Sequence, residues 1–183
     1  MNNTREKNYS ILIKKLNQLG IDTSILNEKY GEQIKIALFN TTTSTSFEGS
    51  LLEYVINILT PSALKLSEIY FTDDKLDAIN KDSLIKVCLL THISKCNMFT
   101  KGKREGTYEY AQYPYALKMG MRSVAICSEC GINLTAEELE AMTILDREND
   151  DQTKFFSSPL AAIFKMANEM TFLKIKNIKS NKY

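Results

Sequence analysis

Apolar residues recur at helical spacing along most of this 183-residue chain. The most apolar stretch is Asp82–Lys95, in which seven of the first twelve residues are apolar. A helix that is apolar on nearly every side lies inside a protein rather than on its surface. We therefore predict a buried central helix over Asp82–Lys95, with an N-cap at Asp82 or Ser83.

The same spacing predicts further helices over residues 5–19, 22–30, 33–39, 51–70, 117–130, 135–145 and 157–173. Pro61 is expected to kink the helix over 51–70 or to split it after Leu59. Thr135 and Glu138 have the spacing of a capping box, and Ser157-Ser158-Pro159 places an N-cap before a proline in the first turn. Gly131 is a plausible C-cap for the helix before it.

Tyrosines alternate with other residues after the basic run Lys101–Gly106, which predicts a small extended β-arm near residues 106–115. Tyrosine beside lysine and arginine can contact nucleic acid, but an ordinary hairpin or a protein contact surface is the favoured interpretation. The polar segment Asn40–Ser46 is expected to be an exposed connector rather than a binding loop. Residues 174–183 are expected to form a mobile basic tail. The predicted fold is an all-α single domain spanning 1–183, a bundle of about seven helices with one small β-arm.

Composition narrows the function classes only a little. The formal net charge is +1, so a polyanionic partner is not indicated and nucleic acid is not expected. No stretch has the length and apolar character of a membrane span, and the first ten residues lack the apolar region of a signal peptide. The chain is therefore expected in a virion or a host cytoplasm, without a membrane partner. Its cysteines are expected to be thiols, at Cys88, Cys96, Cys127 and Cys130.

Five stretches together resemble one protein family. They are EGSLLEYV (Glu48–Val55), LIKVCLLTHISK (Leu84–Lys95), YALKMGMRSV (Tyr115–Val124), INLTAEELEAM (Ile132–Met142) and FKMANEM (Phe164–Met170). In this order and spacing they resemble small HD-domain phosphohydrolases of bacteria and their phages, over about residues 47–170. Residues 1–46 then form an N-terminal helical extension. The resemblance implies a helical core and a site where histidines and aspartates hold one or two divalent cations that activate water against a phosphate ester.

The positions that the resemblance assigns to metal ligands carry other residues here. They fall on Tyr54, on Thr91-His92, on Met119, on Leu145 or Asp146, and on Asn168. His92 is the only histidine in the chain, whereas such a site needs at least two. We therefore predict that the chain is not an enzyme and has no catalytic, cofactor-binding or metal-binding residues. His92 is expected to be a hydrogen-bonded structural residue.

Two other groups of residues invite a chemical interpretation. Cys127 and Cys130 form a C-x-x-C pair, which with Cys88 and Cys96 offers a redox pair or four zinc ligands. Since only one such pair exists, core cysteines are the favoured interpretation. Acidic residues after the helix over 135–145 form a stretch that is expected to be a solvated loop, at Asp146, Glu148, Asp150 and Asp151.

The sequence therefore indicates a non-catalytic HD-fold protein that acts through protein contacts. An Asn-, Lys- and Ile-rich composition in a family common in phages favours a structural subunit of a phage virion, in a homo-oligomeric ring, tail or connector assembly. The expected contact surfaces are the Tyr-rich arm (Tyr108–Tyr115), the Asn40–Ser46 loop and the termini. The alternatives are a divergent phosphohydrolase or nucleotidase and a sensor that binds a nucleotide or small ligand in the emptied pocket.

Overall fold

Helices make up nearly all the regular structure of the computed structural model, which describes residues 2–40, 47–70, 79–104, 107–112, 116–146 and 157–180. In chain order the α-helices are α1 (Asn2–Gln18), α2 (Ser24–Ile36), α3 (Ser50–Tyr54), α4 (Thr60–Tyr70), α5 (Lys81–Leu90), α6 (Met119–Glu129), α7 (Ala136–Thr143) and α8 (Pro159–Ser180). A π-helical turn, Val55–Leu59, joins α3 to α4 without a break. Counting that segment once, the described residues form seven helices in one mostly helical domain, as predicted.

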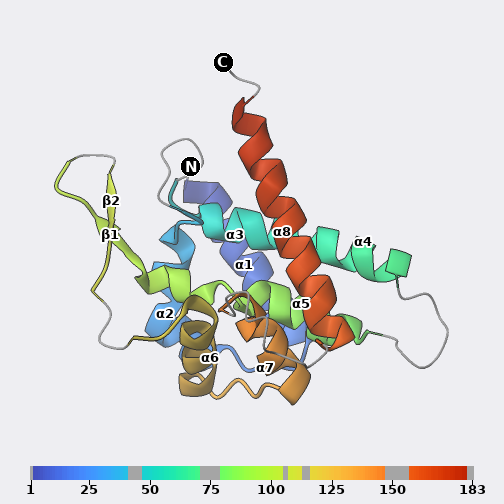
Figure 1. Cartoon of the computed structure of the whole chain (residues 1–183). Coiled ribbons are helices and arrows are strands. Elements are labelled where there is room, and N and C mark those ends of the chain that lie inside the picture. The colour runs from blue at the N-terminus through green and yellow to red at the C-terminus, as the bar shows by residue number, and fades with distance from the viewer. Residues whose placement is uncertain are drawn as a thin grey trace.

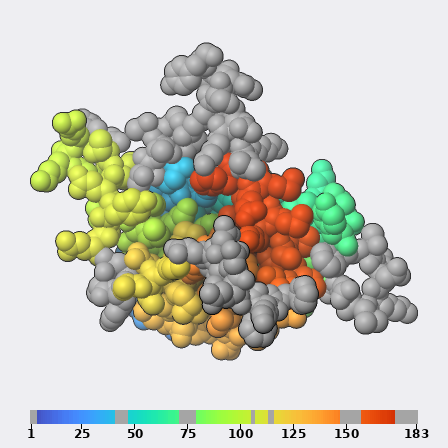
Figure 2. Space-filling view, in the orientation of Figure 1, coloured from blue at the N-terminus to red at the C-terminus, as the bar shows by residue number. Residues whose placement is uncertain are grey.

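Helix α5 is the centre of this domain, as its apolar pattern predicts. Leu84, Val87, Cys88, Leu89 and Leu90 are buried, and the helix packs against α4, α7 and α8. Figure 1 shows α8 crossing the front of the domain over α5 and α4. Figure 2 shows the same helix at the surface of that face, beside α4.

The boundaries of the central helix differ from the prediction at both ends. The N-cap is Asn80, whose side-chain oxygen accepts hydrogen bonds from the backbone N–H groups of Asp82 (2.9 Å) and Ser83 (3.1 Å). The α-helix ends at Leu90, and a separate 3₁₀ turn follows at Ile93–Asn97. The apolar pattern continues through this change because both segments are buried, so periodicity alone did not locate the break.

Helix α2 is one continuous element, whereas the sequence predicted two short ones over 22–30 and 33–39. Gly31 lies inside it, and a Cβ placed there would be 2.9 Å from the hydroxyl oxygen of Tyr9 on α1. Glycine at this position leaves room for the Tyr9 side chain between α1 and α2, although it weakens a helix interior. Local propensity favours a break at this position, and tertiary packing overrides it.

Pro61 neither ends nor splits the helical segment that contains it. The helix widens one turn earlier, so the backbone N–H of Thr60 bonds to the carbonyl of Val55, five residues back. The hydroxyl of Thr60 donates to the same carbonyl at 2.6 Å. A π turn before the proline thus lets the chain stay helical through a residue that has no N–H to donate.

The predicted caps of the last three helices are confirmed. The Thr135 hydroxyl accepts from the Glu138 N–H at 3.2 Å, and the Glu138 carboxylate accepts from the Thr135 N–H at 2.9 Å. The Ser158 hydroxyl accepts from the Ala161 N–H, directly before Pro159. Gly131 ends α6 with a φ of 69°. Helix α8 itself runs to Ser180, so the prediction of a helix end near 173 and a tail from 174 was wrong.

A two-stranded hairpin, β1 (Phe99–Lys101) with β2 (Tyr108–Tyr110), projects from the helical body (Figures 1 and 2). Its strands are antiparallel, with Phe99 opposite Tyr110 and their ring centroids 5.2 Å apart. This confirms the predicted β element, although the first strand lies before the basic run and was not predicted. Tyr113 and Tyr115 lie outside the described residues.

Two other predicted loops, residues 41–46 and the acidic stretch 147–153, also lie outside the described residues. None of the described helices has both the length and the apolar character needed to cross a bilayer.

Candidate functional site

Three of the positions that the resemblance assigns to metal ligands meet in the core of the domain. Tyr54 lies at the end of α3, His92 follows α5, and Asn168 lies on α8. The side-chain oxygen of Asn168 is 2.9 Å from Nε2 of His92 and accepts a hydrogen bond from the Tyr54 hydroxyl at 3.1 Å. Tyr54 and His92 are only 2% and 3% exposed, while Asn168 is half-buried. We refer to these three residues as the Tyr54–His92–Asn168 cluster.

Neighbouring side chains close this cluster from several directions. The hydroxyl of Thr171 lies 2.9 Å from that of Tyr54 and donates to the carbonyl of Ala167 at 2.7 Å. The ring of Phe39 stacks on Tyr54 with centroids 4.0 Å apart and meets His92 edge-on at 6.3 Å. The cluster is therefore walled by an aromatic ring and a threonine, and its polar groups mostly satisfy one another.

Burial holds both titratable members of the cluster in their neutral forms. Burial lowers the pKa of His92 to about 3, with help from the nearby charge of Lys95 and against the hydrogen bond with Asn168. Burial raises the pKa of Tyr54 to about 12, partly offset by the hydrogen bond with Thr171. Nδ1 of His92 has no hydrogen-bond partner among the described residues. The imidazole thus donates from Nε2 to Asn168, and its second nitrogen is unprotonated.

Lys95 is the charged group nearest to the cluster. Its ammonium donates to the backbone carbonyl of Phe39 at 2.5 Å and lies 4.2 Å from the centroid of the Phe39 ring. Burial lowers its pKa to about 8. Within the described part of the chain, no carboxylate lies within ion-pair distance of Lys95. Among the described residues, this cation is therefore compensated by a carbonyl and an aromatic face.

Because a buried cation without a carboxylate is costly, Lys95→Met is expected to raise the free energy of unfolding at pH 7 by about 1 kcal/mol. Methionine has a similar length and keeps the contact with Phe39, although it leaves the Phe39 carbonyl without its donor. Urea denaturation measures the change. Lys14→Met, at an exposed position, is the control and should change little. A clear loss of stability in Lys95→Met alone would mean that the ammonium is favourable where it lies.

The remaining positions from the resemblance make hydrogen bonds elsewhere. The Asp146 carboxylate accepts from the N–H groups of Gly120 and Met121, both at 2.9 Å, and so caps the start of α6. The Thr91 hydroxyl donates to the Val87 carbonyl, and Met119 offers its carbonyl to the Ser94 hydroxyl. The bond between Met119 and Ser94 holds α6 against the 3₁₀ turn after α5.

The residues of the cluster do not fit the divalent cations that the resemblance implies. Such cations prefer carboxylates and several imidazoles, whereas this cluster offers one imidazole, a protonated phenol and an amide. Among the described residues, no group of three or more His, Cys, Asp or Glu side chains is placed to hold a metal ion. The described residues of this cluster therefore do not form a ligand set suited to such a cation.

The four cysteines are buried free thiols. Burial raises the pKa of Cys96 and of Cys127 to about 12, and it raises the pKa of Cys88 and Cys130 as well. The C-x-x-C pair lies at the C-terminal end of α6, where the helix dipole disfavours a thiolate. Their arrangement agrees with the interpretation of core cysteines.

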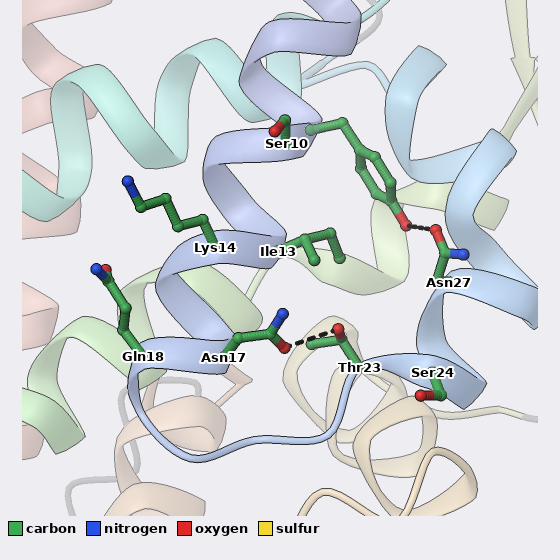
Figure 3. Close-up of a pocket in the computed structure, with 9 residues that line it drawn as sticks. Ser10, Ile13, Lys14, Asn17, Gln18, Thr23, Ser24 and Asn27 are labelled. Carbon is green, nitrogen blue, oxygen red and sulfur yellow. Dashed lines mark hydrogen bonds between the residues drawn. The ribbon is translucent and has the colours of Figure 1, made fainter.

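A shallow groove of about 730 Å³ lies between α1 and α2 (Figure 3). The Tyr9 hydroxyl donates to Asn27 at 2.8 Å, and the Thr23 hydroxyl donates to Asn17 at 2.9 Å. Lys14 points away from these pairs. The polar groups of the groove therefore serve mainly to join the two helices.

Sequence reasoning identified the members of the cluster but not the residues around it. Phe39 was assigned to a short helix, and Lys95 was treated as part of the central helix. Comparisons of the chain with protein-family models, with curated proteins and with solved structures give no match. The chemistry of the described residues is therefore the basis for a functional proposal.

Proposed function

We propose that this chain is a non-catalytic helical protein that acts through contacts with other proteins, as a repeated subunit of a larger assembly. The observation that supports it is the closed Tyr54–His92–Asn168 cluster. Its imidazole is neutral and buried, its phenol is protonated, and both bond to the same amide oxygen. A general base needs access to substrate and a pKa near the working pH, and His92 has neither.

The hairpin supports the proposal that the chain acts through contacts with other proteins. Two strands of three residues are marginally stable alone in water, and this hairpin stands away from the body (Figure 1). Tyr110, near its end, is 71% exposed. Tyrosine is enriched at protein interfaces because it offers a large apolar area and a hydroxyl together. A partner that covers the hairpin would stabilise it.

The specific form of the proposal is a subunit of a phage virion, in a ring, tail or connector. It rests on the resemblance and on the Asn-, Lys- and Ile-rich composition. A homo-oligomer follows because rings and tails repeat one subunit around an axis.

Native mass measurement of the full chain tests the proposal. Species at multiples of 20.8 kDa are expected, with no phosphoesterase activity against a general phosphate ester. Tyr110→Ser is expected to weaken self-association at least about tenfold, as loss of an interface tyrosine often does. Tyr70→Ser, at another exposed tyrosine, is the control. A monomer with phosphoesterase activity that His92→Ala abolishes would contradict the proposal.

A further inference from the structure

A pocket of about 450 Å³ lies beside the hairpin. Its walls come from four parts of the chain: the first turns of α1, the segment Phe47–Gly49 before α3, Glu53 of α3, and Tyr108 of β2, which pairs with Lys101 next to the turn. We refer to it as the hairpin-side pocket. It is separate from the Tyr54–His92–Asn168 cluster, none of whose three residues lines it.

The two carboxylates of this pocket differ in their partners. Glu48 forms an ion pair with Arg5, and its other oxygen lies 3.6 Å from the ammonium of Lys101. Glu53 is half-buried and accepts one hydrogen bond, from the side-chain amide of Asn8 at 3.0 Å. No cation in the described part of the chain lies within ion-pair distance of Glu53. The pocket thus holds one oriented carboxylate that lacks a counter-ion.

Two aromatic rings complete the lining. Phe47 is 49% exposed at the edge of the pocket, and Tyr108 is half-buried on the hairpin. Aromatic faces attract cations, and a planar guanidinium stacks on a ring while it donates hydrogen bonds to a carboxylate. Because Glu48 is already paired with Arg5, which also lines the pocket, Glu53 is the carboxylate left for an occupant. An anionic occupant would be repelled by Glu53, and an apolar one would bury Glu53 without a partner.

We propose that the hairpin-side pocket binds an arginine side chain of a protein partner. The inference rests on the proposed function and names the partner's chemistry at one contact. The pocket volume falls within the range of sites that enclose a small ligand, about 300–1,000 Å³, so it accepts the side chain with some of its backbone. Asn8 fixes the Glu53 carboxylate before the guanidinium arrives, which limits the entropy lost on binding.

The test is an NMR titration of the full chain with the peptide acetyl-Gly-Arg-Gly-amide. Binding in the millimolar range is expected, with the largest amide shifts at Glu53, Gly49 and Tyr108. The same peptide with citrulline, which is neutral and of similar shape, should not bind. Glu53→Gln keeps an acceptor for Asn8 but removes the charge, and it should weaken binding about tenfold or more. Glu169→Gln, an exposed site on α8, is the matched control.

A second variant tests the pocket at another residue, in case Glu53→Gln changes the local structure. Tyr108→Leu keeps an apolar side chain but removes the aromatic face, and it should weaken binding about three- to fivefold at an exposed cation–π contact. Equal binding of the arginine and citrulline peptides would overturn the proposal, as would unchanged affinity in Glu53→Gln. Free arginine that binds as tightly as the peptide would also overturn it, in favour of a small-molecule site.

These outcomes are distinguishable from failure of the proposed function. Native mass and phosphoesterase activity report whether the chain is a non-catalytic assembly subunit. The titration reports only what the pocket recognises. A catalytic monomer that still binds the arginine peptide would leave the pocket assignment intact and remove the assembly proposal.

Discussion

Glu138→Ala is expected to lower the free energy of unfolding by about 3 kcal/mol, since removal of one partner from a buried ion pair leaves the other charge uncompensated. Glu138 is 3% exposed, and its carboxylate accepts from the Lys86 ammonium at 2.7 Å. The same oxygen closes the capping box of α7 through the Thr135 N–H. One substitution therefore removes both the ion pair between α5 and α7 and one half of the capping box, while the Thr135 hydroxyl still accepts from the backbone N–H of residue 138.

The charge state of Glu138 agrees with this role. Burial favours the protonated carboxyl, but hydrogen bonds from Lys86 and Thr135 outweigh it and hold the pKa below its usual value. The carboxylate is therefore ionised in the folded protein at neutral pH. Thermal unfolding of Glu138→Ala is expected about 6–12 °C below that of the parent chain, given the size of the domain.

Two variants isolate the cause of this loss. Glu137→Ala removes an exposed carboxylate from the same helical turn, and it should cost no more than about 1 kcal/mol through the helix dipole. The double variant Lys86→Met/Glu138→Ala also removes the Lys86 ammonium, which has lost its carboxylate partner. It should therefore recover part of the lost free energy of unfolding. If the two single glutamate variants unfold at the same temperature, the Lys86 pair has no special value.

Strong local signals in the sequence were sufficient for the helices that carry them. The capping box at Thr135 and Glu138, and Ser158 before Pro159, each satisfy backbone groups within four residues, so they act without tertiary context. Gly131 ends α6 for the same local reason. These boundaries were predicted from sequence because the interactions that set them are short in range.

The errors arose where distant contacts decide the local structure. Gly31 resembles a helix break, but it lies where α1 approaches α2. The cap of α5 is an error of a different kind, because Asn80 caps the helix through residues two and three positions on, and the prediction placed the cap inside the apolar run instead. The run itself continues past the end of the helix. Apolar periodicity indicates which residues are buried. Because residues on both sides of the change from α-helix to 3₁₀ turn are buried, the periodicity does not mark where the helix ends.

In the candidate site, too, some residues were predicted from the sequence and others were not. Tyr54, His92 and Asn168 were selected together from the sequence, and the fold places the side-chain oxygen of Asn168 within hydrogen-bond distance of both Tyr54 and His92. The contact between Lys95 and Phe39 joins residues that are 56 positions apart, and no sequence pattern marks it. Its effect on the electrostatics of His92 therefore required the three-dimensional structure.

The burial of His92 predicts a pH dependence of stability from a single group. In the folded protein its pKa is lowered to about 3, whereas the ordinary value in an unfolded chain is 6.5. Between these values the unfolded chain binds a proton that the folded chain does not, so stability falls as the pH falls. The stability is fully present above about pH 6.5. From pH 7 to pH 5 the free energy of unfolding is expected to drop by about 2 kcal/mol.

His92 is the only histidine in the chain, so most of the slope between pH 7 and pH 5 should come from this residue. Urea denaturation at several pH values measures it. His92→Gln keeps a donor toward Asn168 and should be nearly independent of pH in this range. Lys95→Met should raise the pKa of His92, but a rise of about one unit from a value near 3 would change the drop between pH 7 and pH 5 by no more than about 0.1 kcal/mol. Carboxylates titrate mainly below pH 5, which sets the lower limit of the measurement. A slope that persists in His92→Gln would mean that the imidazole accepts its proton without cost and that the cluster opens to water.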